Sequence, residues 1–495
     1  NLGADVTDFY LERIWGDQYW QDGQRLPVTV REETIEVADA EPITFDVRST
    51  HHGPIISDQA PMQSVQTAPA PLTGGFAKYD VALSWTALTP GTTADALLAL
   101  NVATSAADIA AAAAQLDAPA QSIIWASTDG HIGYQASGRI PVRAYVDAES
   151  PADGTWPQPG WDSRYDWQGF VPADQMPTVV DPAEGFIVAA NQPVTLSGAG
   201  PFFTADPDYG FRAARIRALI QQAISSGTPL TVELMNTWQN DNYNPAAELL
   251  MPYIRGMVLD RWDGEGLMLL RDWDYANDAD SPAAAYFNTF LSYVYESTFS
   301  DELPSGGVPD DSSRWLAVLA AILPDEDSRW WDDKTTPNVV ENRDQILSQA
   351  LVSARYRLTV DIAKNTEDWQ WGRIHTVELT HPLFVGTDSS SPLAALFNPR
   401  RLPVSGGSCS LNATNWNPQT GPEVVSGPTM RMVVDLANLD DSTWVVLTGV
   451  SGHPGSRHYT DQIAAWADGR TYQWPFSLAA VQDDAKNTLT FKPTR

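Results

Sequence analysis

The sequence predicts an α+β protein with strands at both ends of the chain and helices between them. Apolar and polar residues alternate in the first and last portions, as they do on half-buried strands. The middle instead follows the 3.6-residue period of amphipathic helices. The apolar share of 43% in 495 residues is ample for a sizeable core. This order of elements favours an architecture in which the first and last portions share one sheet.

The first portion has the pattern of a sheet. Residues 27–57 alternate apolar and polar side chains through "TIEV", "ITFDVRST" and "GPIIS". At 122–140, "SIIWASTDGHIGYQASGRI" contains two strand-like runs that meet at Asp129-Gly130, a dipeptide that favours a tight hairpin turn. We therefore expect sheet over about residues 1–210, with a helical interruption near 94–116.

The middle of the chain, about residues 211–360, has helical periodicity. It includes "RAARIRALIQQAI", closed by Ser226-Gly227, and "NRDQILSQALVSARYRL". Strands return over about 400–495 in "TMRMVVDL" and "TWVVLTGV", with a short helix expected in "YTDQIAAWADG". No internal repeat is evident, and we expect residues 1–495 to form a single unit.

Composition excludes several classes of function. Acidic residues outnumber basic ones by 62 to 30, for a net charge of −32, which disfavours binding to nucleic acid or to anionic lipid. The longest apolar runs, such as "IAAAAA" at 109–114, are far below the roughly 20 residues that a membrane span needs. Cys409 is the single cysteine, so neither an internal disulfide nor a cysteine-based metal cluster is expected.

The stretch "HHGPIISD" at 51–58 suggests a metal or an acid–base site, because two histidines stand beside a Gly-Pro turn. Neighbouring residues on a strand point to opposite faces, so His51 and His52 are not expected to share one ligand, and a structural role is favoured. The other histidines show no HExxH or comparable spacing, so no zinc site is predicted. Acidic clusters such as "PDEDSRWWDDK" and the 19 Trp leave a glycosidase or sugar-binding protein open.

No GxSxG, Walker loop or GxGxxG occurs in the chain. Several phrases in order nevertheless resemble the β chain of the penicillin acylase family, which belongs to the N-terminal nucleophile hydrolases. They include "NLGADVTDFYLERI", "RSTHHGPIISD", "DGHIGYQASGRIPVR", "GFIVAANQPV", "YGFRAARI" and "GVSGHPGSRHYTDQIAAWADG". The resemblance implies a four-layer αββα sandwich with a long helical insertion. It also implies a periplasmic or secreted heterodimer of α and β chains, made by autocatalytic processing.

The resemblance further implies that a Ser at the start of the β chain is the nucleophile. The stretch that resembles "NLGADVTDFY" lies some tens of residues inside that chain. We therefore expect the Ser-initiated start and the α chain to lie outside these 495 residues. The Ser attacks an amide carbonyl, its own α-amine accepts the proton, and water releases the acyl group. Asn1 cannot replace it, because an amide side chain is not a nucleophile.

The same resemblance assigns catalytic roles within the chain. Asn191, in "GFIVAANQPV", matches the asparagine whose side-chain amide stabilises the oxyanion, and the backbone N–H of Asn1 matches the second donor. Arg212, in "YGFRAARI", matches an arginine that orients that asparagine, whereas Arg215 is expected to be structural. From the residues alone, the favoured interpretation of Asn191 is a turn residue before Gln192-Pro193, and the resemblance reverses that preference.

A structural calcium site is implied as well, by the opening "NLGADVTDFY". Its ligands would be the Asp5 carboxylate, the Thr7 backbone oxygen and the Asp8 carboxylate. Calcium takes six to eight oxygen ligands, so others must join them. The local candidates are Gly154 and Asp206 or Asp208, and the α chain would supply a Glu.

These expectations add up to an amide hydrolase that removes an acyl group from a substrate such as a β-lactam antibiotic or an acyl-homoserine lactone. Ile124 and Trp125 are candidates for the acyl pocket or for the strand core. The alternative is a catalytically inactive, calcium-stabilised binding protein of the same fold, which would lack the Ser.

Overall fold

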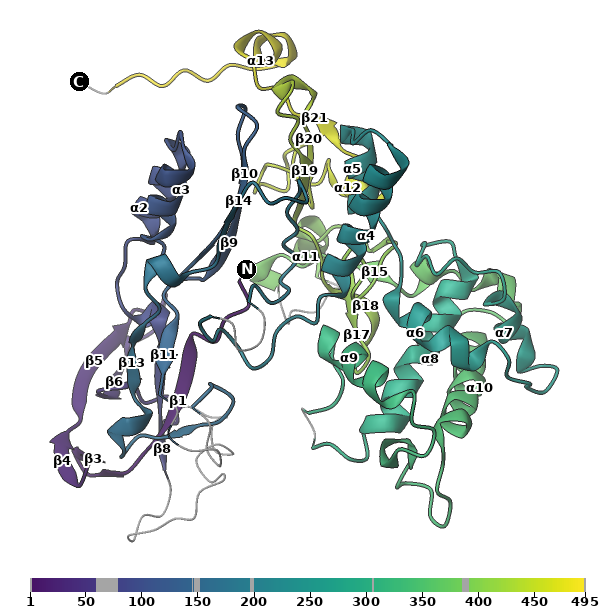
Figure 1. Cartoon of the computed structure of the whole chain (residues 1–495), viewed down its shortest axis with the longest axis horizontal. Coiled ribbons are helices and arrows are strands. Elements are labelled where there is room, and N and C mark those ends of the chain that lie inside the picture. Colours follow the sequence, from purple (N-terminus) through teal and green to yellow (C-terminus); the bar gives the residue numbers. More distant parts are fainter. Residues whose placement is uncertain are drawn as a thin grey trace. The chain divides into compact units, whose positions relative to one another are not determined.

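The computed structural model describes residues 2–58, 79–144, 146, 152–195, 200–304, 307–384 and 391–493. The chain divides into two compact units, Asn1–Asp208 and Tyr209–Arg495, each of which is described by itself. Figure 1 draws the first unit in purple to blue, with most of the strands, and the second in teal to yellow, where most of the helices occur. The predicted α+β class is confirmed.

The first unit is built mainly from short strands. They are β1 (Thr7–Glu12), β2 (Ile14–Trp15), β3 (Gln18–Gln21), β4 (Gln24–Pro27), β5 (Thr29–Ile35), β6 (Ile43–Thr50), β7 (Gly53–Pro54), β8 (Asp80–Trp85), β9 (Gln121–Ala126), β10 (Ile132–Ser137), β11 (Pro141–Arg143), β12 (Gln158–Pro159), β13 (Trp167–Phe170) and β14 (Thr178–Val180). Its helices are η1 (Thr86–Leu88), α2 (Thr93–Asn101), α3 (Ala106–Ala113), η2 (Ser163–Tyr165) and η3 (Ala173–Gln175).

Strand β1 is the centre of a three-stranded sheet in the order β12-β1-β8. It runs parallel to β12 and antiparallel to β8, with Tyr10 opposite Ala82. Because side chains alternate along a strand, Asp8, Tyr10 and Glu12 share one face of β1, and all three are buried. Two carboxylates on a buried face require partners, and these partners define the sites described below.

The predicted hairpin around Asp129-Gly130 is confirmed. Strands β9 and β10 pair from Ile132–Ala126 to Ser137–Gln121. Gly130 has a φ of 97°, which only glycine adopts readily, so the turn closes where the sequence indicated. The alternation read at 27–57 likewise forms the paired strands β5 and β6.

One small core of the first unit gathers residues from distant segments. Its buried members are Leu2, Ala120, Tyr134, Ala136, Ile140, Met176 and Phe203, and Ala4, Val6, Val171, Ile187, Ala189 and Val194 pack against them. We call this cluster the Leu2 core. It joins the start of the chain to the loop that follows β14.

The second unit is rich in helices. They are α4 (Phe211–Ser226), α5 (Val232–Gln239), α6 (Pro245–Ile254), α7 (Gly264–Leu269), α8 (Pro282–Phe299), α9 (Ser313–Ile322), η4 (Arg329–Trp331), α10 (Arg343–Asp361), η5 (Thr366–Asp368), η6 (Trp371–Arg373), η7 (Pro382–Phe384), α11 (Pro392–Phe397), η8 (Leu439–Asp441), α12 (Ile463–Ala467) and α13 (Leu478–Asp484). Its strands are β15 (Thr376–Val377), β16 (Leu402–Pro403), β17 (Asn415–Asn417), β18 (Gly421–Ser426), β19 (Met430–Val433), β20 (Thr443–Val446) and β21 (Tyr472–Gln473).

Local sequence explains where these helices begin and end. Asn342 caps α10 in a reciprocal capping box with Gln345, and Ser281 caps α8 just before its first-turn Pro282. Gly227, with a φ of 69°, ends α4 in the left-handed conformation. These are the boundaries that the sequence signals predict.

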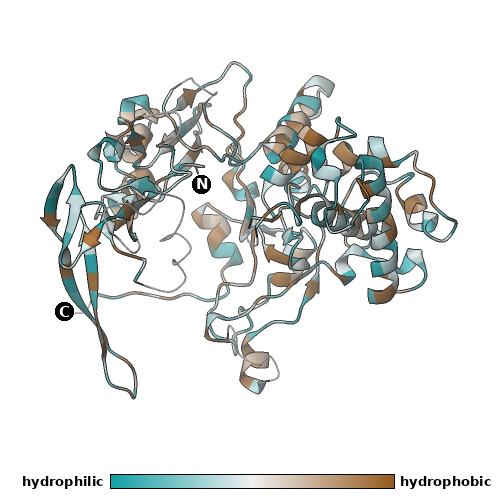
Figure 2. Ribbon diagram, turned by 90° about the horizontal axis from the view of Figure 1, so that it is seen from below, coloured by the Kyte–Doolittle hydropathy of each residue, from teal (hydrophilic) through white to brown (hydrophobic). Residues whose placement is uncertain are grey.

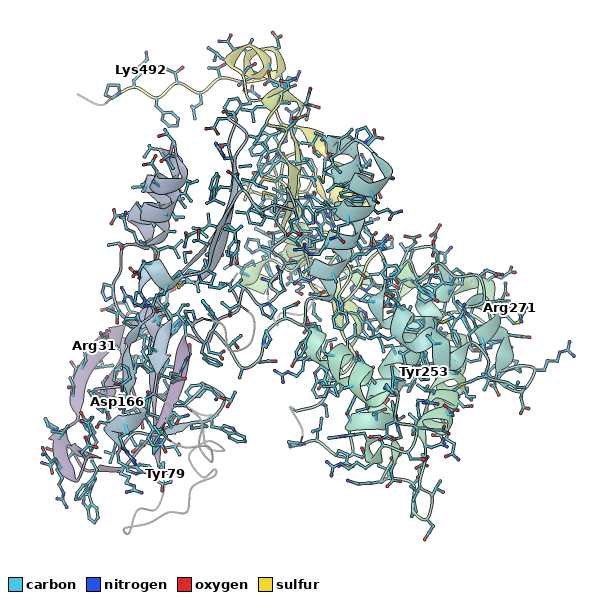
Figure 3. All side chains as sticks on the ribbon, in the orientation of Figure 1. Arg31, Tyr79, Asp166, Tyr253, Arg271 and Lys492 are labelled. Carbon is cyan, nitrogen blue, oxygen red and sulfur yellow. The ribbon has the colours of Figure 1, made fainter. Side chains whose placement is uncertain are left out.

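Helices α8 and α10 form the centre of a large apolar core in the second unit. The core includes the fully buried rings of Trp331, Trp369 and Trp371. Figure 2 shows hydrophobic and hydrophilic residues interspersed along the helices of the chain. In Figure 3, Tyr253 lies among the helices, whereas Asp166 lies beside the strands of the first unit.

Each sheet formed by the described residues contains strands of one unit only. A sheet shared by the first and last portions is therefore not seen in this part of the chain, and the four-layer sandwich stays a prediction. Among the described residues, no helix combines the length and apolarity that crossing a bilayer demands.

Candidate active site

The loop after β14 carries Asn191, the residue expected to stabilise an oxyanion. Asn191 has a φ of 70°, in the left-handed region that non-glycine residues rarely adopt. The next residue braces the loop: Gln192 Nε2 donates to the carbonyl of Val188 at 2.7 Å, and its Oε1 accepts from the N–H of Ala190 at 2.7 Å. The half-buried Asn191 is thus held in an uncommon conformation by its neighbours.

The start of the chain lies against this loop. A Cβ placed on Gly3 would stand 3.7 Å from the carbonyl oxygen of Asn191. Leu2 and Ala4 also share the Leu2 core with Ile187 and Ala189 from the loop. Tertiary structure therefore brings Asn191 beside the segment with which the resemblance pairs it.

The described structure does not test two other predicted catalytic residues. Asn1, expected to offer a backbone N–H, lies outside the described residues. Arg212 is half-buried in the first turn of α4, in the second unit, whereas Asn191 belongs to the first. The role of Arg212 in orienting Asn191 stays a prediction.

Arg215, one turn further along α4, makes the contacts of a structural residue. Its Nη2 lies 2.6 Å from Asp241 Oδ2, and its guanidinium lies 4.3 Å from the ring centre of Tyr243. Planar stacking with a simultaneous carboxylate fork suits arginine particularly well. These contacts agree with the structural role expected for Arg215.

The predicted calcium ligand Asp8 is buried on β1 and surrounded by donors. Arg143 donates from Nε to Asp8 Oδ2 at 2.8 Å and from Nη2 to Oδ1 at 3.1 Å. Trp167 Nε1 donates to the same Oδ2. These charge-assisted bonds give the buried Asp8 carboxylate a cationic partner within the chain.

Other expected calcium ligands lie around Asp5. The N–H of Ala205 donates to Asp5 Oδ2 at 3.3 Å. The exposed Asp206 follows Ala205 in the sequence, so its backbone lies close to the Asp5 carboxylate. A Cβ on Gly154 would be 3.3 Å from both Asp5 Cβ and Asp8 Oδ1, a tight contact at a φ of 86°, which favours glycine. Thr7, the remaining candidate, begins β1 between the two aspartates. In this structure the Arg143 guanidinium bonds to these groups, since it donates to the Asp8 carboxylate and, from Nη2, to the carbonyl of Asp5 at 2.9 Å, and the calcium site stays a prediction.

Comparison with known proteins decides the family. The sequence profile of the penicillin amidase family matches residues 1–483. The chain belongs to the penicillin amidase family.

Relatives in this family are longer than the chain. Penicillin acylase 2 proenzyme of Pseudomonas sp. (strain SE83) is 28% identical over 515 aligned positions, which cover 99% of this chain and 60% of the relative. Acyl-homoserine lactone acylase QuiP of Pseudomonas aeruginosa is 27% identical over 531 positions, covering 98% of this chain and 60% of the relative. The chain therefore spans about three fifths of the length of both relatives.

A solved penicillin amidase structure supports the fold. The thermostable penicillin G acylase from Alcaligenes faecalis superposes with a TM-score of 0.69 at 17% identity, covering 100% of this chain and 88% of that one. At this identity the match establishes the fold alone.

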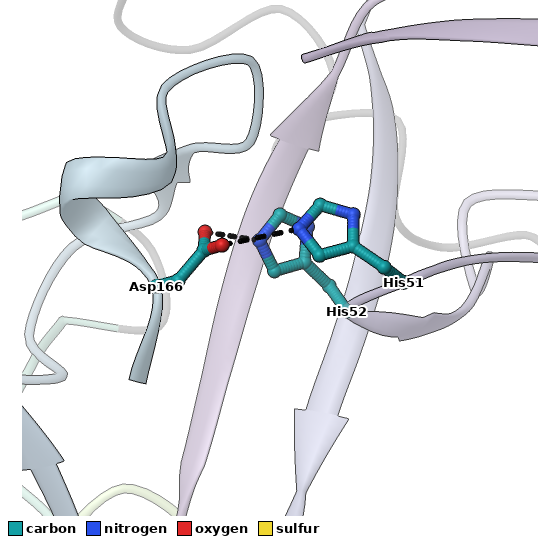
Figure 4. Close-up of side chains that lie close together, drawn as sticks. All are labelled: His51, His52 and Asp166. Carbon is teal, nitrogen blue, oxygen red and sulfur yellow. Dashed lines mark hydrogen bonds and ion pairs between the residues drawn. The ribbon is translucent and has the colours of Figure 1, made fainter. Parts of the chain in front are cut away.

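The prediction that His51 and His52 point away from each other is wrong. His51 and His52 do not point to opposite faces: their ring centres lie 3.8 Å apart. Both follow the end of β6 and lie in a turn, where the alternation of a strand no longer applies. They also meet Asp166, which comes from a distant part of the first unit (Figure 4). Sequence spacing gave no signal of this meeting.

Electrostatics around His52 reflect two carboxylate neighbours. Its Nδ1 lies 2.8 Å from Glu12 Oε1, and its Nε2 lies 2.9 Å from Asp166 Oδ1. Burial lowers the pKa of His52, but the hydrogen bonds with Asp166 and Glu12 outweigh it and raise the pKa above its usual value. Burial raises the pKa of Asp166, yet the bonds with His51 and His52 bring it down to about 2. Asp166 is therefore a carboxylate at neutral pH.

Proposed function

We propose that this chain is part of an acylase that hydrolyses the amide bond of an acyl-amide such as a penicillin or an acyl-homoserine lactone. Family membership supports the reaction class, and the names of the two relatives support the two substrate types. The observation that carries the proposal is the position of Asn191 against the Leu2–Gly3 segment, with its backbone in the left-handed conformation.

In this proposal, the chain supplies transition-state stabilisation. The side-chain amide of Asn191 donates to the oxygen of the scissile carbonyl as it becomes negative, and the N–H of Asn1 donates to the same oxygen. Arg212 orients Asn191. The nucleophile is a Ser at the start of a processed chain, outside the 495 residues, with its own α-amine as the base. The α chain of the same precursor completes a heterodimer that acts in the periplasm or outside the cell.

We also propose a structural calcium ion held by Asp5, Thr7, Asp8 and Asp206. Support comes from the close approach of Gly154 to both Asp5 and Asp8, and binding of the ion would require Arg143, which donates to Asp8 and to the carbonyl of Asp5, to move aside. Isothermal titration with Ca²⁺ should show binding that Asp5→Asn weakens at least about tenfold, because one charged ligand is lost. Asp95→Asn, in the first turn of α2, is the matched control and should change nothing.

The decisive experiment for the activity uses the complete precursor gene and the purified, processed protein. Mass measurement and N-terminal sequencing of every chain should find one that begins with Ser. Asn191→Ala should then lower kcat/KM by a factor of about 10²–10³, the usual effect of losing one oxyanion donor.

A matched control separates chemistry from backbone strain. Asn338 is exposed in the second unit and has a φ of 69°, so Asn338→Ala meets the same left-handed backbone at a residue that has no role in the proposed chemistry. Its kcat/KM should stay within twofold of the wild type. If Asn191→Ala behaved like Asn338→Ala, the oxyanion assignment would be wrong. A protein without a Ser-initiated chain, inactive on both substrates, would instead be the inactive binding protein.

A further inference from the structure

Three potential metal ligands converge in the first unit, apart from the proposed acylase site. His51 Nε2 lies 3.3 Å from Asp166 Oδ2, and His52 Nε2 lies 2.9 Å from Asp166 Oδ1. The ligand atoms of the three residues all lie within 4.8 Å of one another. Figure 4 shows both imidazole rings facing the same carboxylate.

The two rings are held in place by stacking. His52 stacks on Tyr10 of β1, with ring centres 3.6 Å apart and planes 9° from parallel. His51 stacks on Tyr19 of β3 at 5.6 Å and 17°. Rigid imidazoles lose little freedom when they bind an ion, so both Nε2 atoms are preorganised.

A buried carboxylate stands behind His52 as an orienting partner. Glu12 is fully buried, and its Oε1 lies 2.8 Å from His52 Nδ1 and accepts from Thr50 Oγ1 at 2.7 Å. A Cβ on Gly160 would come within 2.8 Å of the Glu12 carboxylate, so a glycine is needed here to leave it room. A metal-ligating histidine usually donates its second ring N–H to such a carboxylate, which fixes the tautomer and strengthens the ligand.

We propose that His51, His52 and Asp166 bind one zinc ion, with Glu12 orienting His52. Zinc accepts imidazole nitrogen and carboxylate oxygen at about 2.0–2.2 Å in tetrahedral geometry, which separates neighbouring ligand atoms by about 3.3 Å. The two measured distances, 3.3 and 2.9 Å, run to different oxygens of Asp166, so the carboxylate turns to offer one oxygen to the ion, and Gln21 Nε2, which lies 2.9 Å from His51 Nε2, is displaced. Two nitrogen ligands disfavour calcium or magnesium, which prefer oxygen alone.

The site also has a way in for the ion. The His51 side chain is 31% exposed and that of Asp166 is 25% exposed, whereas that of His52 is 4% exposed. The ion therefore enters from the solvent side of His51. Its three protein ligands leave the fourth coordination position of zinc for a water molecule. The ion links the turn after β6 to the residue before β13, two segments that are far apart in the sequence.

The experiment uses the purified protein, stripped with EDTA and dialysed, with Zn²⁺ alone as the probe. We expect one Zn²⁺ per chain by elemental analysis and calorimetry, and a higher Tm with zinc than without it. His51→Gln should weaken Zn²⁺ binding at least about a hundredfold, since one of three protein ligands is lost. His131→Gln is the matched control. His131 is exposed and its Nδ1 lies 2.7 Å from Asp181 Oδ2, so it forms a pair of one histidine with one aspartate.

Two outcomes would overturn the proposal. The first is a wild-type protein that takes up no Zn²⁺, which would leave the cluster as a protonated His52 bridging two carboxylates. The second is equal Zn²⁺ binding by the wild type and His51→Gln. If His51→Gln fails to fold, Co²⁺ added to the stripped wild type decides: tetrahedral visible bands that excess Ca²⁺ does not remove support the site, and their absence rejects it.

Discussion

The two units are stabilised by different kinds of burial. In the second unit, one large apolar cluster includes the rings of Trp331, Trp369 and Trp371. In the first unit, the apolar clusters of the described residues are small, and β1 buries the carboxylates of Asp8 and Glu12. Apolar burial needs volume and shape, whereas a buried carboxylate needs particular partners. Packing should therefore dominate the stability of the second unit, and specific polar pairs that of the first.

The largest effect should come from the aromatic core of the second unit. Phe290, on α8, is fully buried and its ring centre lies 5.7 Å from that of Phe287. Phe290→Ala should lower the free energy of unfolding by about 3–5 kcal/mol, because it removes apolar contacts and leaves a cavity. Urea denaturation followed by circular dichroism measures this loss. Val360→Ala, 64% exposed on α10, should change stability by less than about 0.5 kcal/mol.

A smaller loss is expected when the buried ion pair of the first unit is broken. Arg143→Met leaves Asp8 without its cationic partner and should cost about 3 kcal/mol, at the low end for buried pairs because Trp167 still donates to Asp8. The control is Arg164→Met, which removes an exposed partner of Asp162 and should cost under about 1 kcal/mol. Equal losses in the two variants would contradict the contrast between the units.

The pH dependence of stability should reveal His375, a titratable residue buried beside an aromatic ring in the second unit. His375 stacks on Trp371 with ring centres 4.4 Å apart, and burial lowers its pKa to about 4. The unfolded chain, with a His pKa of about 6.5, binds the extra proton first as pH falls. Stability from His375 is therefore complete above about pH 6.5 and declines by up to about 1.4 kcal/mol per pH unit down to about pH 4.

Two measurements check this behaviour of His375. A nuclear magnetic resonance titration of its ring should show a neutral imidazole at pH 6, and unfolding should become easier between pH 6.5 and 4. Titration of the ring near 6.5 in the folded protein would show that burial does not govern this group.

The smallest effects should be the same in both units, because helix caps act locally. Asn342→Ala removes the cap of α10, and Ser105→Ala removes the cap of α3, where Ser105 Oγ accepts from the N–H of Asp108. Each should cost about 1 kcal/mol, measured by urea denaturation. A difference between them well above that size would mean that tertiary contacts, and not the cap alone, determine the loss.

Local signals predicted much of the fold. The hairpin at Asp129-Gly130 and the end of α4 at Gly227 depend on turn and cap residues that act within a few positions. The alternation rule gave the wrong result for His51 and His52, because β6 ends at Thr50 and the rule holds only within a strand. The resemblance selected Asn191, and the tertiary structure then placed it against Gly3.

The sequence by itself determined the α+β class, the helix caps, the hairpin turn and the acidic surface, because these depend on periodicity, turn chemistry and composition. Only the tertiary structure decided which distant residues meet: Asn191 with Gly3, Asp8 with Arg143, and His51 and His52 with Asp166. The physical reason is that the partners of a buried polar group are selected by the packing of whole elements. Sequence spacing carries no record of that packing.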